Sequence, residues 1–210
     1  MDTHTEQLDE FKQALTLNAS HYEVHLATDS IQRLADYYEL LNIWNQRLHL
    51  VAPCSADEFA QRHILESLLL LRYLPKGATV VDIGSGAGLP IIPCTVVRPD
   101  LKAVLIESSQ KKTVFLLEAL NLSGNLSSAK VIAERFEKIG TPDADFVTCR
   151  ALDRFSEMLP RLIEWSPQPS TLLLFGGEDL RKALHTQKLG FEALHIPRSE
   201  RRFLFAIKRK

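Results

Sequence analysis

The sequence predicts an α/β fold: a doubly wound sheet of seven strands with the last strand antiparallel, preceded by an N-terminal helical extension. Two observations lead to this prediction. Apolar residues recur at helical spacing up to residue 76, and short apolar runs rich in β-branched residues alternate with helical stretches after Gly77. We therefore expect residues 1–76 to form the extension and residues 77–210 the core, together as one compact unit.

The extension is expected to contain three helices, over residues 4–17, 29–49 and 55–74. Ser55 is placed to cap the third of them. Tyr37, Tyr38 and Trp44 lie on the apolar stripe of the second helix. Their rings could stack on a nucleic-acid base, but their helical spacing favours packing of the extension against the sheet.

The core alternates between strands and helices. Strands are expected at residues 79–83, 102–107, 130–133, 145–149, 171–175, 191–196 and 202–207. Helices are expected between them, at residues 89–98, 110–122, 154–165 and 178–189. The last gap is too short for a helix, so the sixth and seventh strands should form a hairpin, which makes the final strand antiparallel.

The composition excludes several classes of protein. Lys and Arg number 25 against 26 Asp and Glu, so no overall field indicates a nucleic-acid partner. After residue 197, however, six basic residues stand against Glu200 alone, and this patch is either a phosphate-binding surface or a solvated terminal strand. Three cysteines without a CxxC pair disfavour a disulfide framework and a metal site. The acidic N-terminus and short apolar runs predict no signal peptide or membrane span, and hence a cytoplasmic chain. We expect a monomer, because no long exposed heptad or edge motif stands out in the sequence.

The stretch VDIGSGAGLP joins the first predicted strand to the next helix. Asp82 lies at the end of the strand, and Gly84, Gly86 and Gly88 form the turn. Ligands of open parallel sheets bind outside the carboxyl ends of the strands, where glycine lets the backbone come close to them. A dinucleotide fingerprint would need glycine or alanine where Leu89 stands. The alternative is a glycine turn without a ligand.

A second acidic residue strengthens the case for a nucleoside ligand. Glu107 ends the second predicted strand, 23 residues after Gly84, an offset at which a carboxylate can accept both hydroxyls of a ribose. Glu107 could instead cap the following helix. Asp82 is expected to accept hydrogen bonds from backbone amides of the tight turn in either case.

The segment DIGSGAGLPIIPCTVVRPDLKAVLIESSQKK resembles the first motif of class I S-adenosylmethionine-dependent methyltransferases and, almost block for block, the bacterial RsmG (GidB) family. That family methylates N7 of a guanine in the 530 loop of 16S ribosomal RNA. The segments LLNIWNQRLHLVA, RHILESLLLL, AERFE and FVTCRALD are similar to the same family. The resemblance implies a class I methyltransferase Rossmann-like sheet, S-adenosylmethionine as cofactor, and 16S ribosomal RNA or the 30S subunit as partner.

The residue patterns and the resemblance together imply two sets of residues. Cofactor contacts are expected at Asp82, Gly84, Gly86, Gly88, Leu89, Glu107, Ala133, Glu134 and Arg150. RNA contacts are expected at Lys111, Lys112, Arg135, Arg201 and Arg202. Arg150, at the end of the fourth predicted strand, is the expected catalytic positioning residue for RNA phosphate or the cofactor carboxylate. A surface salt bridge is the alternative for it.

The chain departs from the family at several positions. Ile132 replaces an arginine, Phe175 replaces a lysine, and Glu66 stands where an aspartate is usual. Two lost cations weaken phosphate binding, and Arg135 is close enough in sequence to Ile132 to compensate in part. His63 follows an arginine in a similar family motif, and either bridges helix and sheet or faces the cleft.

The expected chemistry needs little from the protein. N7 of neutral guanine has a lone pair, so attack on a methyl group needs no general base, and catalysis becomes positioning. The chain has no (N/D)PP(Y/F) motif for an exocyclic amine, because the corresponding segment reads CRALD. Two alternatives remain: a methyltransferase of the same fold acting on a small molecule or protein, and a non-catalytic binder of RNA or nucleotide.

Overall fold

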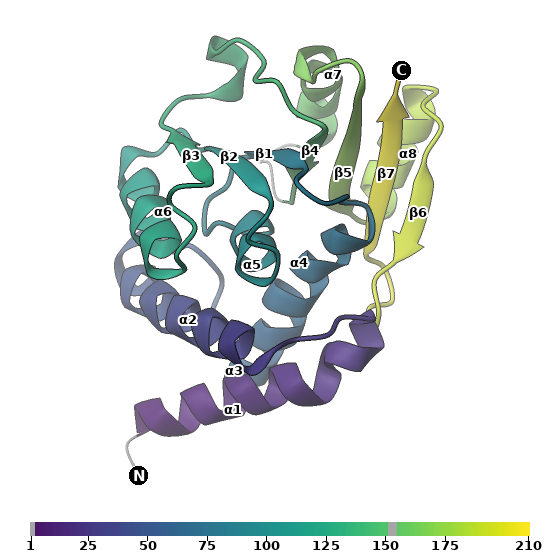
Figure 1. Ribbon diagram of the computed structural model, residues 1–210. Helices are drawn as coiled ribbons and strands as arrows, with labels where there is room; N and C mark the ends of the chain where they lie inside the picture. Colours follow the sequence, from purple (N-terminus) through teal and green to yellow (C-terminus); the bar gives the residue numbers. More distant parts are fainter. Residues whose placement is uncertain (1–2, 151–154) are drawn as a thin grey trace.

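The computed structural model describes residues 3–150 and 155–210 and contains a seven-stranded sheet in the order β3-β2-β1-β4-β5-β7-β6 (Figure 1). The strands are β1 (Thr79–Ile83), β2 (Lys102–Ile106), β3 (Ala129–Ile132), β4 (Phe146–Cys149), β5 (Ser170–Gly176), β6 (Glu192–His195) and β7 (Phe203–Arg209). Strand β7 pairs antiparallel with both β5 and β6, whereas the pairs among β1 to β5 are parallel. The predicted doubly wound sheet with an antiparallel last strand is confirmed.

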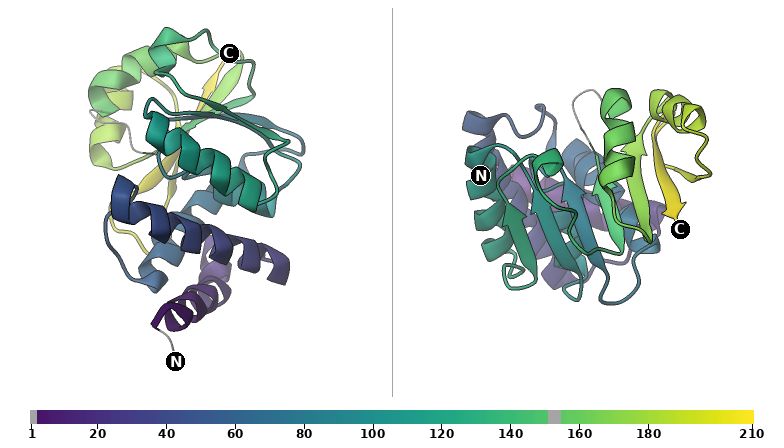
Figure 2. Two further views of the ribbon diagram at one scale, coloured as in Figure 1. Left: turned by 90° about the vertical axis from the view of Figure 1, so that its left-hand side faces the viewer. Right: turned by 90° about the horizontal axis from the view of Figure 1, so that it is seen from above.

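Helices cover both faces of the sheet (Figure 2). One face carries α5 (Ile91–Val97) and α6 (Gln110–Leu122), and the other carries α7 (Phe155–Trp165) and α8 (Glu178–Thr186). The predicted helix 89–98 begins later, because residues 85–90 form the turn after β1. Residue 154, where the helix before β5 was expected to begin, lies outside the described residues. Between β3 and β4 the described chain forms only the 3-10 turn η4 (Phe136–Lys138).

The N-terminal helices are α1 (Thr3–Asn18), the 3-10 turn η1 (Ala19–Tyr22), α2 (Thr28–Leu48), α3 (Ala56–Phe59), the π-helical segment η2 (Ala60–Leu65), α4 (Glu66–Leu68) and the 3-10 turn η3 (Leu69–Arg72). Of these, α2 packs against α5 and α6 on the side away from the sheet, α4 lies beside α5, and α1 packs against α2, α3 and η2 (Figure 1). Ser55 caps α3 as predicted, since its Oγ accepts from the Glu58 amide at 3.1 Å. The predicted single helix over residues 55–74 changes to π and 3-10 geometry along its length.

Aromatic side chains join the extension to the sheet domain. Tyr37 is fully buried, and its hydroxyl donates to the carbonyl of Ala87 in the turn after β1 at 2.6 Å. Tyr38 stacks on Phe11 with ring centroids 4.5 Å apart. The Trp44 indole donates to the Glu118 carboxylate of α6 at 2.9 Å. The predicted packing against the sheet domain is confirmed for Tyr37 and Trp44, whereas Tyr38 packs on Phe11 within the extension. Tyr37 connects α2 directly to the glycine turn.

The centre of the sheet is buried on both faces, which explains its continuous apolar runs. Val80 and Val81 of β1 are both fully buried, one in each of the two hydrophobic clusters that the sheet separates. Cys94 and Cys149 are buried packing residues, as expected. None of the described helices is long and apolar enough to cross a membrane.

Candidate active site

A cleft of about 940 Å³ opens at the carboxyl ends of β1 to β4, near the upper end of the range for small-molecule sites. Two walls of this cleft differ in origin. The turn wall consists of residues 84–87, which follow β1, and Glu107, which follows β2. The helix wall consists of Leu50, Val51, His63 and Arg150.

The turn wall is shaped by backbone that only glycine adopts readily. Gly86 has φ +51°, and a Cβ placed on it would come no nearer than 3.6 Å to any atom, the Gly84 carbonyl oxygen. Gly88 has φ +80°, and its Cβ would overlap the Ile92 side chain at 2.3 Å. Gly86 therefore borders open space, whereas Gly88 is required by helix packing.

Glu107 connects two parts of the turn wall. Its Oε2 accepts from the Gly86 amide at 2.9 Å, and its Oε1 accepts from the Ser109 amide at 2.8 Å. The carboxylate is 7% exposed and lines the cleft, and each oxygen retains a second acceptor site. The cap of α6 is Ser109 rather than Glu107, so the helix-cap alternative does not account for Glu107.

Asp82 differs from expectation. Its side chain is 1% exposed, and neither carboxylate oxygen has a hydrogen-bond partner within the described chain. The prediction that it accepts from turn amides is wrong, because those amides are directed elsewhere: the Gly84 and Ser85 amides donate to the Ile106 carbonyl. Burial raises the pKa of Asp82 well above its usual value, and nearby Glu107 adds to the shift.

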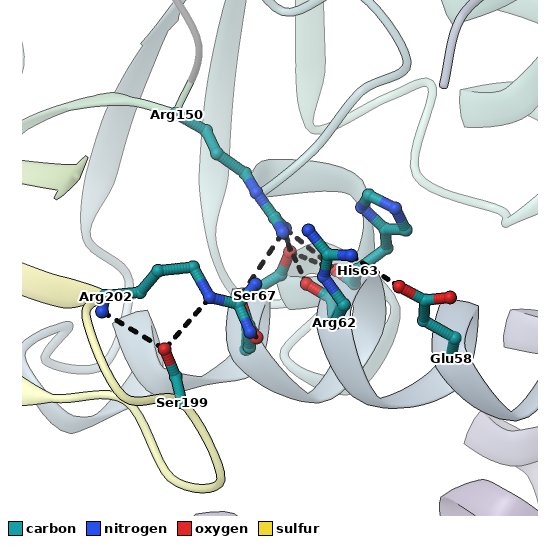
Figure 3. Close-up of polar contacts among 8 residues, drawn as sticks. Glu58, Arg62, His63, Ser67, Arg150, Ser199 and Arg202 are labelled. Atoms are coloured by element: carbon teal, nitrogen blue, oxygen red, sulfur yellow. Dashed lines mark hydrogen bonds and ion pairs between the residues drawn. The ribbon is translucent and has the colours of Figure 1, made fainter. Parts of the chain in front are cut away.

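Arg150 reaches from the end of β4 into the helix wall (Figure 3). Its guanidinium donates to the carbonyls of Arg62 and His63 and to the Ser67 hydroxyl, the last at 3.1 Å. It also lies 3.4 Å from the Glu66 carboxylate, and the side chain is 16% exposed. Arg150 thus fixes the helical turn that carries His63, and the surface salt bridge considered as an alternative does not describe it.

Glu66 is the shared acid of this cluster. It is 2% exposed and pairs with Arg202 of the last hairpin at 2.8 Å as well as with Arg150. One buried carboxylate between two guanidiniums leaves net positive charge behind the helix wall. Arg202 pairs with Glu66 and with the Ser199 hydroxyl, and its expected RNA contact stays a prediction.

His63 lies in the π-helical segment η2 and lines the cleft. Its ring lies 4.9 Å from that of Phe59, and no partner for its buried Nδ1 exists in residues 3–150 or 155–210. Burial lowers the pKa of His63 to about 3, and Arg150, Arg62 and Arg202 contribute to the shift. The imidazole is therefore neutral at pH 7.

The two lost cations have different structural consequences. Phe175 is buried. The Cζ atom of Arg150 lies over the Phe175 ring, 5.7 Å from its centroid, in a cation-π arrangement. Ile132 is partly buried and packs into the cluster under α7. Arg135, the suggested compensating cation, does line the cleft.

The cleft brings together part of each predicted set. The residues that line it are Gly84, Gly86, Leu89, Glu107, Glu134 and Arg150 of the cofactor set and Lys112 and Arg135 of the RNA set. The residues absent from its lining are Asp82, Gly88, Ala133, Lys111, Arg201 and Arg202. Residues 151–153, at the end of the segment CRALD, lie outside the described chain.

Sequence reasoning missed three contributors. The Asn45 side chain makes paired hydrogen bonds of 3.0 Å with the amide and carbonyl of Val51, and so fixes the loop that supplies Leu50 and Val51. Met158 and Arg161 of α7 also line the cleft. The only available signal was the resemblance around the Trp-Asn pair, because the periodicity of α7 does not reveal which of its faces meets the cleft.

Comparison with known sequences gives consistent matches over most of the chain. The GidB family model, described as rRNA small subunit methyltransferase G, matches residues 30–202. A ribosomal RNA small subunit methyltransferase G from Sorangium cellulosum (strain So ce56) is 36% identical over 161 residues, which cover 73% of this chain and 67% of that protein. A protein of the same name from Halorhodospira halophila (strain DSM 244 / SL1) is 33% identical over 162 residues, or 77% of each chain.

Solved structures give a match of fold. A SAM dependent methyltransferase from Aquifex aeolicus superposes with a TM-score of 0.58 at 17% identity, covering 82% of this chain and 98% of that chain. At this identity the likeness concerns the fold alone. It confirms the predicted class I methyltransferase type of sheet.

Proposed function

This chain belongs to the rRNA small subunit methyltransferase G family, and we propose that it transfers a methyl group from S-adenosylmethionine to N7 of a guanine in the 530 loop of 16S ribosomal RNA. The observation that carries the proposal is the turn wall, in which the Gly86 amide and the Glu107 carboxylate meet at the head of a large cleft. Family membership supports methyltransferase activity on 16S ribosomal RNA, and the reaction of the family supports N7 of guanine as the methylated atom.

The residues present fit S-adenosylmethionine. The space beside Gly86 is open, which suits the close approach of the amino-acid part of the cofactor. Glu107 has free acceptor sites for the two ribose hydroxyls. Glu134, after β3, lines the cleft where the adenine would lie.

When bound, S-adenosylmethionine would supply a methyl group on a sulfonium, which the N7 lone pair of guanine could accept. The chain's own residues need no general base, because N7 of neutral guanine carries no proton to remove. Their contribution is to hold the cofactor and the base in line and to exclude water. Glu107 orients the ribose, and Arg150 keeps the helix wall in place as a positioning residue.

Cations at the cleft suit a phosphate backbone. Lys112, Arg135 and Arg161 come from α6, the loop after β3 and α7, so they surround the opening from three elements. We extend the proposal to Arg161, which is exposed and makes no ion pair or hydrogen bond with the described residues. Glu134 and Glu137 beside them limit non-specific attraction.

The extension and the sheet domain, residues 1–76 and 77–210, are proposed to act as one unit. Buried residues of both belong to a single hydrophobic cluster, and the extension supplies most of the helix wall. We also propose a monomeric enzyme that works in the cytoplasm, where its ribosomal substrate is assembled.

Labelling experiments test the proposal. The purified protein is incubated with methyl-labelled S-adenosylmethionine and either 30S subunits or naked 16S RNA from cells lacking the endogenous family enzyme. Reductive cleavage at N7-methylguanine then maps the label. A single labelled guanine in the 530 loop is expected. Cofactor binding without RNA label would contradict the substrate assignment and point to a different substrate for the same fold.

A further inference from the structure

His63 comes from the helical extension but lies in the same cleft as the glycine turn and Glu107. Its segment η2 is π-helical. This geometry is rare in proteins, and where it occurs it is often found at functional sites. The ring rests against Phe59 at 4.9 Å, and the His63 carbonyl accepts from Arg150 at 3.2 Å. Packing and backbone contacts therefore hold the imidazole at the cleft without using its ring nitrogens.

The surroundings of His63 are cationic. Arg150 and Arg202 share the Glu66 carboxylate, and Arg62 pairs with Glu58 on the same helical face (Figure 3). Burial and these guanidiniums depress the pKa of His63, which keeps the ring neutral at pH 7. A neutral imidazole has one N–H donor and one lone pair.

The two nitrogens of His63 have unequal access. Nδ1 is shielded from solvent without a hydrogen-bond partner in the described parts of the chain, so the edge carrying Nε2 is the one that the cleft can reach. An N–H on the buried Nδ1 would have no acceptor among the described residues, whereas an N–H on Nε2 can be satisfied by a group in the cleft. The proton therefore belongs on Nε2, which becomes a donor toward the cleft.

A donor beside a guanine about to be methylated at N7 has one suitable acceptor on the same edge. The major-groove edge of guanine carries the acceptors N7 and O6, and adenine replaces O6 by an amino group that donates. A bond to N7 would block the attacking lone pair. We propose that His63 recognises the acceptor guanine by donating its Nε2–H to O6, an assignment that rests on the proposed function.

The neighbouring surfaces suit a flat base. Leu50 and Val51, held by Asn45, and Met158 of α7 line the same cleft with apolar side chains. A neutral donor also avoids placing a second cation beside a sulfonium. His63 thus selects guanine over adenine without opposing the charge that the reaction moves onto the purine.

The test changes hydrogen-bonding groups on both partners. 30S subunits are reconstituted with 16S RNA that carries guanine, inosine or 2-aminopurine at the methylated position. Inosine retains O6 and N7, whereas 2-aminopurine retains N7 and lacks O6. Single-turnover rates of methyl transfer are measured for the wild-type chain and for His63→Phe. The wild type is expected to transfer about ten- to a hundredfold more slowly to 2-aminopurine than to inosine.

The His63→Phe variant is expected to lose that discrimination, with rates on inosine and 2-aminopurine within about twofold. His63→Gln, whose amide nitrogen can reach the place of Nε2, should restore much of it, and His63→Asn, which mimics Nδ1, should not. Retention of the wild-type inosine to 2-aminopurine ratio by His63→Phe would overturn the inference. The inference would also be overturned if His63→Gln lost as much cofactor affinity, measured by calorimetry, as it lost in methyl-transfer rate.

The failures of the two proposals can be distinguished. A wild-type chain that labels no guanine would overturn the proposed function and this inference with it. A wild-type chain that labels guanine, together with a His63→Phe variant that still discriminates, would overturn the role of His63 alone.

Discussion

The turn wall and the helix wall of the cleft are built from different kinds of group. The turn wall uses backbone amides, glycine conformations and one carboxylate, from residues 84–87 and Glu107, which directly follow the paired strands β1 and β2. The helix wall uses side chains from the loop after α2, from η2 and from the end of β4, and Arg150 and His63 meet only through tertiary packing. The difference suggests that cofactor binding depends on local backbone, whereas substrate recognition depends on long-range contacts.

The largest expected effect concerns the turn wall. Gly86→Asp places a side chain at φ +51° and a second carboxylate next to Glu107, in space assigned to the cofactor. Cofactor affinity in a calorimetric titration should fall at least about a hundredfold. Gly140→Asp, at a glycine with open surroundings, is the matched control and should bind normally. Unchanged affinity of Gly86→Asp would remove the turn wall from the cofactor site.

The next effect concerns the anchor of the helix wall. Glu66→Gln leaves Arg150 and Arg202 without their shared buried anion, which should lower the free energy of unfolding by about 3–5 kcal/mol. Urea denaturation measures this loss. Glu58→Gln removes an exposed pair with Arg62 and should cost about 0–1 kcal/mol. Equal losses in the two variants would mean that the buried cluster is no stronger than a surface pair.

A smaller effect separates the functions of the two walls. Asn45→Ala removes both hydrogen bonds to Val51 and should lower the free energy of unfolding by about 1–2 kcal/mol. The loosened loop should raise KM for RNA severalfold and leave cofactor affinity unchanged. Gln46→Ala, at the exposed residue next to Asn45, is the control and should leave both properties unchanged. A cofactor affinity that falls in parallel with RNA affinity would show that the walls do not act separately.

The effect that is smallest at neutral pH is a pH dependence of stability. His63 in the folded chain has its pKa lowered to about 3, whereas the unfolded chain takes up this proton near pH 6.5. Protonation therefore favours unfolding, and stability falls as pH drops from about 6.5 toward 3. His63→Gln should show a shallower fall in melting temperature over this window. The exposed His25→Gln should behave like wild type, and a wild-type slope in His63→Gln would argue against a neutral buried imidazole.

Residues close in sequence or adjacent in the sheet could be placed from the sequence. The seven strands and the antiparallel last strand follow from apolar runs and connection lengths, and the turn with Glu107 follows from spacing, because these features depend on local backbone preferences. The predicted hydrogen bonds of Asp82 were wrong, because the sequence does not show that the Gly84 and Ser85 amides donate to the Ile106 carbonyl instead.

The sequence by itself determined the sheet, the glycine turn and the family resemblance, since periodicity and short motifs encode local geometry. Only the tertiary structure decided that Arg150 binds the helix of the extension, that Arg202 pairs with Glu66, and that His63 lies at the cleft. These contacts join residues about 80 or more positions apart, 87 from Arg150 to His63 and 136 from Arg202 to Glu66. Such pairings depend on how helices dock on the sheet, and no local pattern in the chain records that docking.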